Sequence, residues 1–391
     1  MLPGKVTTAM LCLESAGFEV FTVGGCVRDI LLKKTPHDWD LTTSALPEQI
    51  IRCFSGFKLI LKGLKHGTVT VLIENEPIEI TTYRTDGEYP DFRHPESVHF
   101  TNSLKADLSR RDFTINAMAM DRSLTIYDFF NGKSDLADKK IRCVGNAQKR
   151  FSEDALRILR GMRFASTEGF SLEEKTLTAI NALAPNLKHI APERIAAELK
   201  KMLTLPNAGS IIQQTLPVFK ILFSSLSCSA EQWTNTCAYI TASGCRAELS
   251  FAHILGLCDF KEELARLKIE NTLKKEIRML LENRETIPEN NKKSLTRVMC
   301  RLGREDTMLL LHFLISCNKA DPAILHTALL AAAGCCSIHE LDINGNDLKL
   351  LGIKDRAIGK TLRMLLTAVT EEKCENKKDQ IISYLSKNNI L

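Results

Sequence analysis

The hydrophobic pattern of this 391-residue chain changes once, near residue 150. Before that point short β-branched runs alternate with turns, which is typical of strands in a domain of mixed α/β structure. After it Leu, Ile, Ala and Met recur three and four residues apart as far as Tyr384, the period of helices. The sequence therefore predicts an α+β chain of several domains, with a sheet-based head and an almost all-helical remainder. The strands are expected at 18–23, 68–73, 78–83 and 124–127.

Composition limits the class of protein but does not identify a function. With 44% hydrophobic and 25% charged residues, the chain has the make-up of an ordinary globular protein. A net charge of +5 permits a polyanionic partner without requiring one. The thirteen cysteines are scattered, with no Cys/His metal spacing, and are expected to be reduced and mostly buried thiols. No run reaches the roughly 18 apolar residues of a membrane span. We therefore expect no membrane association and a cytoplasmic location.

A glycine-rich turn lies at the end of the first expected strand. Gly24 and Gly25 lead from that strand towards a short helix expected at Ile30-Leu31-Leu32, and Arg28 stands just before that helix. Glycines let a backbone approach a ligand closely, helix-start N–H groups attract anions, and an arginine adds a charged fork. The turn is thus a candidate phosphate site. The alternative is a tight strand-to-helix connection with a surface ion pair.

Two aspartates follow the turn at the spacing of alternate strand residues. Asp38 and Asp40 flank Trp39, and side chains two apart on a strand project from the same side. Paired carboxylates repel each other unless a cation lies between them, and hard oxygen ligands suit Mg²⁺. Two such ions about 3.5 to 4 Å apart activate a hydroxyl and stabilise a leaving pyrophosphate. The alternative for this pair alone is a solvated acidic turn.

A third acidic residue fits the same site. Glu79 stands between Ile78 and Ile80 in a strand pattern. If both isoleucines face the core, Glu79 faces the opposite side of the sheet, where it meets either the aspartates or water. We take it as a third catalytic candidate.

These residues carry a resemblance to a known family. The chain resembles the class II tRNA nucleotidyltransferases, which comprise bacterial CCA-adding enzymes and related poly(A) polymerases in the DNA polymerase beta superfamily. The resemblance rests on four ordered motifs that span about the first half of the chain. They are residues 24–29 with Asp38-Trp39-Asp40, residues 110–116, residues 153–160, and residues 192–194 through 198–199.

The resemblance implies a domain order. It predicts a polymerase-beta-like nucleotidyltransferase head at 1–145 with the metal and triphosphate site, and a helical neck at 146–205 for base recognition. A helical body at 206–325 and a tRNA-binding tail at 326–391 would follow. Within the head, it implies that residues 110–116 select ribose and that Arg111 and Asp112 contact the nucleotide. The alternative takes Arg110 and Arg111 as surface charges capping a helix that begins near Asp112.

The expected neck helix offers a way to read bases without a template. Asp154 and Arg157 stand three residues apart, so on one helix they present an acceptor and a donor side by side. Cytosine and adenine each place an amino donor next to a ring acceptor, whereas uracil and guanine place a carbonyl there. The resemblance assigns Asp154 and Arg157 to this role and puts Arg160 and Arg163 near the nucleotide. The alternative is an intrahelical salt bridge with two solvated arginines.

The family contains several activities. A polar loop at residues 86–95 corresponds to one that CC-only enzymes of the family lack, and the tail lacks the strongly basic character usual in its poly(A) polymerases. The resemblance therefore favours full CCA addition to tRNA from CTP and ATP with Mg²⁺, and implies no stable protein partner. Adding A only, adding CC only, poly(A) synthesis and an inactive tRNA-binding protein stay as alternatives.

Overall fold

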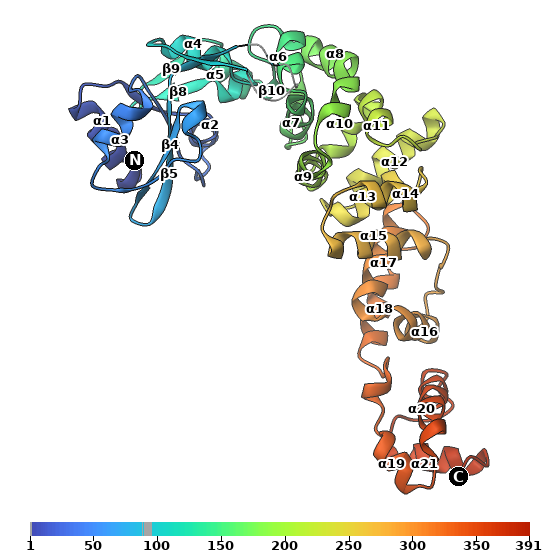
Figure 1. Cartoon of the computed structure of the whole chain (residues 1–391). Coiled ribbons are helices and arrows are strands. Elements are labelled where there is room, and N and C mark those ends of the chain that lie inside the picture. The colour runs from blue at the N-terminus through green and yellow to red at the C-terminus, as the bar shows by residue number, and fades with distance from the viewer. Residues whose placement is uncertain (1, 88, 90–95) are drawn as a thin grey trace. The chain divides into compact units, whose positions relative to one another are not determined.

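The computed structural model describes residues 2–87, 89 and 96–391 (Figure 1). The chain divides into two compact units. The first unit comprises Met1–Thr241 with Ala265–Lys268, and the second comprises Ala242–Leu264 with Ile269–Leu391. Each unit encloses hydrophobic clusters of its own.

The head is built on a mixed sheet. Its strands are β1 Val20–Val23, β2 Asp40–Thr43, β3 Lys58–Ile60, β4 Thr68–Ile73, β5 Glu76–Thr82, β8 Met118–Met120 and β9 Ile126–Asp128. In the described part of the chain these seven strands lie in the order β3-β4-β5-β2-β1-β8-β9. Strand β2 runs parallel to β5, and the other neighbours are antiparallel. The predicted fold class is therefore confirmed for the head.

The two faces of this sheet are covered differently. Leu41, Ile78 and Ile80 are buried on one face, where α1 (Gly4–Ser15) and α3 (Pro47–Cys53) contact β4 and β5. On the opposite face β1 packs against α4 (Leu104–Ser109). That second face continues to Asp40 and Glu79, which are both exposed. The uncovered end of the sheet is where the predicted acidic site lies.

Shorter elements complete the head. The helices not yet given are α2 Gly25–Leu31, η1 Leu64–His66, η2 Thr114–Asn116 and α5 Gly132–Ala137. Two small sheets pair β6 Arg84–Asp86 with β7 Val98–Phe100 and β10 Lys140–Ile141 with β11 Ser171–Leu172.

The rest of the first unit is helical. Its first long helix, α7, buries Leu156, Leu159 and Met162 along one stripe and packs against α9, as an amphipathic helix should. The helices are α6 Ala147–Glu153, α7 Leu156–Ala165, α8 Glu174–Leu183, η3 Ala184–His189, α9 Pro192–Leu203, α10 Ala208–Gln214, α11 Leu216–Leu222 and α12 Ala230–Ala242.

Helices also make up the second unit, around two hydrophobic clusters. One cluster centres on Leu295 and Leu311, and the other on Leu348 and Leu365. The helices from residue 247 onward are α13 Ala247–Leu255, α14 Phe260–Arg266, α15 Asn271–Glu282, α16 Lys292–Leu302, α17 Arg304–Ser316, α18 Ile324–Ala332, η4 Ile338–Glu340, α19 Gly345–Leu350, α20 Asp355–Thr370 and α21 Lys378–Lys387.

The helical second part predicted from the sequence is confirmed, apart from the two-residue strand β11. None of the helices in the described ranges is long and apolar enough to cross a membrane. All thirteen cysteines are free thiols, but only Cys26, Cys143, Cys237 and Cys336 are buried. The expectation of mostly buried thiols was therefore wrong, because eight of the other nine are only partly buried and Cys245 is exposed.

Candidate active site

The predicted acidic residues line one pocket at the start of β2. The pocket has a volume of about 440 Å³ and is lined by Lys5, His37, Asp38, Trp39, Asp40, Glu76, Pro77 and Glu79. Asp40 and Glu79 are register partners on the parallel strands β2 and β5, so their side chains leave the sheet from the same face. The sequence expected Asp38 on the strand as well. It lies in the preceding loop instead, because strand pairing begins at Asp40.

Charge accumulates in this pocket. The pKa of Asp40 is raised above its ordinary value of 3.8, first because its carboxylate loses solvent and then because it faces Glu79 and Asp38, while Arg111 opposes the rise. A divalent cation bound between these carboxylates would relieve the repulsion, and their oxygens are its preferred ligands. The residues present therefore fit a metal ion. Among the described residues, however, no three His, Cys, Asp or Glu side chains form a ready metal-binding group.

The glycine turn adjoins this pocket. Gly24 has a φ of 81°, a conformation that glycine adopts readily, and a Cβ there would lie 3.2 Å from Nη1 of Arg111. Cys26, which follows Gly25, lies close to Asp40. Burial raises the pKa of its thiol to about 11, a hydrogen bond with the backbone of Asp40 lowers it, and the charge of Asp40 raises it. Gly24, Gly25 and Arg111 are thus within a few ångströms of each other and next to Asp40.

Arg28 is held on three sides. Its Nε and Nη2 donate to Oδ1 of Asp29 at 3.0 and 2.8 Å, and its Nη1 donates to Oδ1 of Asn116 at 2.7 Å. Its guanidinium also lies 5.2 Å from the ring centre of Phe164 on α7. The predicted charged fork is therefore already fixed in one orientation, between the head and the first neck helix.

Asp112 connects the same two parts of the unit. Nε and Nη2 of Arg160 on α7 each lie 2.8 Å from its Oδ2, while Oδ1 accepts from the backbone N–H of Phe113 and from Asn116. Burial alone would raise the pKa of Asp112, but the charge and hydrogen bonds of Arg160 hold it below its ordinary value. The carboxylate stays charged and orients Arg160.

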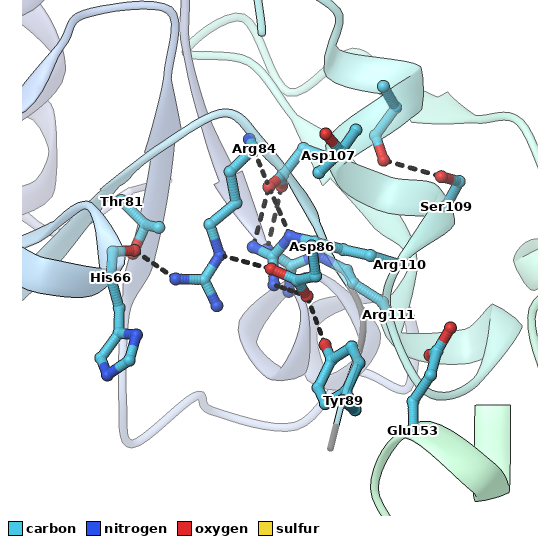
Figure 2. Close-up of polar contacts among 12 residues, drawn as sticks. His66, Thr81, Arg84, Asp86, Tyr89, Asp107, Ser109, Arg110, Arg111 and Glu153 are labelled. Atoms are coloured by element: carbon cyan, nitrogen blue, oxygen red, sulfur yellow. Dashed lines mark hydrogen bonds and ion pairs between the residues drawn. The ribbon is translucent and has the colours of Figure 1, made fainter. Parts of the chain in front are cut away.

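Arg110 and Arg111 are anchored by a carboxylate that the sequence interpretation missed. Asp107 on α4 is fully buried, and its Oδ1 accepts from Nε and Nη2 of Arg110 at 3.1 and 2.8 Å (Figure 2). Its Oδ2 lies 3.5 Å from Nη2 of Arg111 and accepts from the hydroxyl of Thr42, two residues beyond Asp40. Asp107 therefore joins the strand of the acidic pocket to Arg111.

This arrangement overturns the surface-charge interpretation of Arg110 and Arg111. No α-helix begins near Asp112 in the described residues: α4 ends at Ser109, and only the short 3₁₀ helix η2 follows at Thr114–Asn116, with Phe113 rather than an arginine at its N-cap. The sequence signal for Asp107 was an acidic residue three and four positions before Arg110 and Arg111.

The structure does not place Asp154 and Arg157 side by side on one helix. The chain leaves helical geometry at Asp154, between α6 and α7, because Asp154 Oδ1 accepts from the N–H of Leu156 and so caps the start of α7. Arg157 donates to Glu153 at 2.9 Å and to the carbonyl of Arg110 at 3.1 Å. Oδ2 of Asp154 forms a long ion pair of 3.9 Å with Arg194. The prediction that Asp154 and Arg157 share one face of a helix was therefore wrong.

Arg163 is bound by a neighbouring helix, α9. Its Nε donates to Glu198 on α9 at 2.7 Å, and its guanidinium lies 4.3 Å from the ring centre of Phe164. The structure thus gathers Arg28, Arg160 and Arg163 around one aromatic ring. Phe164, like Asp107, was not among the predicted site residues, because a Phe at helical spacing reads as a core residue.

Three family models match the chain. The Poly A polymerase head domain matches residues 20–142, the model described as "Probable RNA and SrmB-binding site of polymerase A" matches residues 169–216, and tRNA nucleotidyltransferase domain 2 matches residues 245–385. These three segments cover the head, part of the neck helices and most of the second unit.

Known proteins match the chain over nearly its whole length. The CCA-adding enzyme of Enterococcus faecalis is 35% identical over 398 residues, which cover 96% of this chain and 93% of that enzyme. The crystal structure of the Bacillus stearothermophilus CCA-adding enzyme in complex with CTP is 32% identical, with a TM-score of 0.79 and coverage of 100% of this chain and 98% of that one. The Thermotoga maritima CCA-adding enzyme in complex with tRNA has a TM-score of 0.73 at 24% identity over 99% of this chain and 96% of that one, and supports the fold alone. The chain belongs to the class II family of CCA-adding enzymes and poly(A) polymerases.

Proposed function

We propose that this chain is a CCA-adding tRNA nucleotidyltransferase. It transfers CMP, CMP and AMP from CTP and ATP to the 3′ end of tRNA and releases pyrophosphate at each step. Relatives named as CCA-adding enzymes over nearly the full length support this. The observation that carries it is the open acidic pocket of Asp38, Asp40 and Glu79 beside the Gly24 turn. Because tRNA and nucleotides are its substrates, we place the protein in the cytoplasm.

Asp38 and Asp40 are the proposed ligands of Mg²⁺. Both carboxylates line the pocket, and the pKa of Asp40 is raised first by loss of solvent and then by the facing charges of Glu79 and Asp38, a repulsion that a cation would offset. Bound Mg²⁺, in a two-metal arrangement, would make the 3′ hydroxyl a better nucleophile and stabilise the leaving pyrophosphate. Glu79 is the proposed third catalytic carboxylate, because it is the register partner of Asp40.

The triphosphate is proposed to lie along the glycine turn. Gly24 and Gly25 leave space for close approach of phosphate oxygens, and Arg28 and Arg111 supply positive charge. Both guanidiniums are already oriented, Arg28 by Asp29 and Asn116 and Arg111 by Asp107. Little side-chain entropy is then lost when the nucleotide binds.

The base is proposed to be read by Asp154 and Arg157, with Asp112, Arg160 and Arg163 lining the rest of the nucleotide site. An acceptor and a donor together match the amino group and ring nitrogen of cytosine and adenine. In the present arrangement Arg157 is bound to Glu153, so reading a base requires its guanidinium to exchange that carboxylate for the nucleotide.

The proposal includes the final A. The loop at residues 86–95, which supports A addition by resemblance, lies partly outside the described residues, since Glu88 and residues 90–95 are not described. Addition of A only, addition of CC only and poly(A) synthesis are therefore separated by experiment.

The test uses a tRNA transcript that ends at the discriminator base. The protein is incubated with Mg²⁺ and CTP, ATP or both, and the 3′ ends are sequenced. We expect CC with CTP alone and CCA with both nucleotides. CC with both nucleotides would identify the CC-only activity, and A added only to a transcript that already ends in CC would identify the A-only activity. Long A tails would identify a poly(A) polymerase, and unchanged ends under every condition would reject transfer altogether.

A further inference from the structure

Phe164 lies at the centre of three arginines. The guanidinium carbons of Arg163, Arg28 and Arg160 are 4.3, 5.2 and 5.5 Å from the centre of its ring. Within about 6 Å a guanidinium is attracted to the negative face of an aromatic ring. The side chain of Phe164 is half-buried.

Each of these arginines is also bound at its edge by a different partner. Arg160 is bound by Asp112, Arg163 by Glu198, and Arg28 by Asp29 and Asn116. Arg160 and Arg163 are each bound through one carboxylate, which leaves the guanidinium free to rotate about that edge, and contact with a ring fixes its plane as well. Arg28 is already bound on both sides, and the ring adds a further contact to it. The ring also offsets the mutual repulsion of three cations gathered in one place.

Phe164 is itself fixed by the head. Its ring meets the fully buried ring of Phe113 edge-on, with ring centres 5.7 Å apart and planes at 75°. Gly161, one turn earlier on α7, allows this approach, because a Cβ there would lie 2.9 Å from Phe113. Phe113 directly follows Asp112, so the ring that packs on Phe164 and the carboxylate that binds Arg160 are neighbours in the head.

We infer that Phe164 is a positioning residue for nucleotide binding, and this inference rests on the proposed function. Its ring holds Arg28 from the head and Arg160 and Arg163 from the neck in the planes in which they meet the nucleotide. Removing the ring while keeping its bulk should therefore weaken the binding of both CTP and ATP. The chemical step, which depends on the acidic pocket, should change much less.

The experiment compares Phe164→Leu with Phe164→Tyr. CTP and ATP binding is measured by calorimetry with Mg²⁺ and without tRNA, so the result does not depend on transfer. We expect Phe164→Leu to weaken binding of each nucleotide about tenfold, the scale of desolvated cation–π contacts. KM should rise by a similar factor with kcat changed by less than about threefold, and Phe164→Tyr should restore binding to within about twofold of wild type.

A matched control separates this role from general packing. Phe219 stacks on Phe223 in the same unit, far from these arginines in sequence, and Phe219→Leu makes the same truncation. It should lower the melting temperature and leave nucleotide binding unchanged. If Phe164→Leu does not fold, Phe164→Met replaces it.

Two results would overturn the inference. One is wild-type affinity in the folded Phe164→Leu or Phe164→Met protein. The other is an equal loss in Phe164→Tyr, which would mean that shape rather than the aromatic ring matters. Absence of CCA addition by the wild-type protein would instead reject the proposed function. The comparison of nucleotide affinities between wild type and variants would remain valid, because it does not depend on transfer.

Discussion

The acidic pocket and the arginine network beside it differ in how their charges are paired. The network consists of Asp107 with Arg110 and Arg111, and of Asp112 with Arg160. In the pocket, the carboxylates of Asp38, Asp40 and Glu79 lie together, and the pKa of Asp40 is raised, first by loss of solvent and then by the charges of Glu79 and Asp38. In the network, the buried carboxylates of Asp107 and Asp112 are bonded to arginines, and their pKa values are lowered. Like charges left together mark a place prepared for a cation, whereas bonded pairs mark a scaffold that orients side chains.

Replacing Asp40 should give the largest effect on activity. For Asp40→Asn we expect kcat for CTP addition to fall at least ~10³-fold, because a proposed metal ligand is lost. The free energy of unfolding should stay the same or rise, because one repelling charge has been removed. Single-turnover addition rates and urea unfolding measure the two quantities. Normal turnover of Asp40→Asn, or a large fall in its free energy of unfolding, would contradict the view that the pocket serves catalysis and the network serves stability.

Replacing Asp107 should mainly lower the stability of the protein. Asp107→Asn leaves Arg110 without its buried counter-ion, so we expect a loss of about 3 to 5 kcal/mol in the free energy of unfolding. Activity should fall as a consequence, because Arg111 and Thr42 lose the same anchor. The exposed Asp355 on α20, paired with Lys349, is the control: Asp355→Asn should change stability by less than about 0.5 kcal/mol. Equal stability of the two variants would argue against a structural role for Asp107.

The network should also make stability depend on acid. The folded-state pKa of Asp112 lies below the ordinary value of 3.8, so its stabilising contribution is complete above that value and is lost as pH falls from it towards the folded pKa. We therefore expect Asp112→Asn to be less stable than wild type at pH 6, and the gap to narrow steadily below pH 3.8. Urea unfolding at a series of pH values measures this. A gap that stays constant with pH would contradict the assignment.

Glu79 should give the smallest effect. Because it shares the pocket but is not one of the two proposed metal ligands, Glu79→Gln should lower kcat only about tenfold. Stability should be unchanged, since Glu79 is exposed. Addition rates for Glu79→Gln and Asp40→Asn in one assay decide the order. An equal loss in both would make Glu79 a full partner of the aspartates.

Local patterns in the sequence were enough to predict the acidic pocket. The alternation in β4 and the glycines before Asp38 and Asp40 are features of neighbouring residues, and the structure keeps them together. Three-residue strands such as β3, β6, β7 and β8 escaped prediction, because so short a run has no readable period.

The network depends on contacts between distant residues. Asp107 bonds Thr42 across 65 positions, and Arg28 reaches Phe164 on a different helix, so no spacing rule links them. The helical spacing of Asp154 and Arg157 misled for a related reason: Asp154 caps α7 and so lies outside both helices. The pocket was therefore predictable from sequence, and the network that orients it was not.

Manganese binding tests the central claim most directly. Mn²⁺ replaces Mg²⁺ at oxygen sites and is counted by its free-ion electron paramagnetic resonance signal. Titrated without nucleotide, the wild type should bind Mn²⁺, and the folded Asp38→Asn/Asp40→Asn protein should have lost that binding, while Asp355→Asn keeps it. Equal Mn²⁺ binding by the wild type and the double variant would contradict the account.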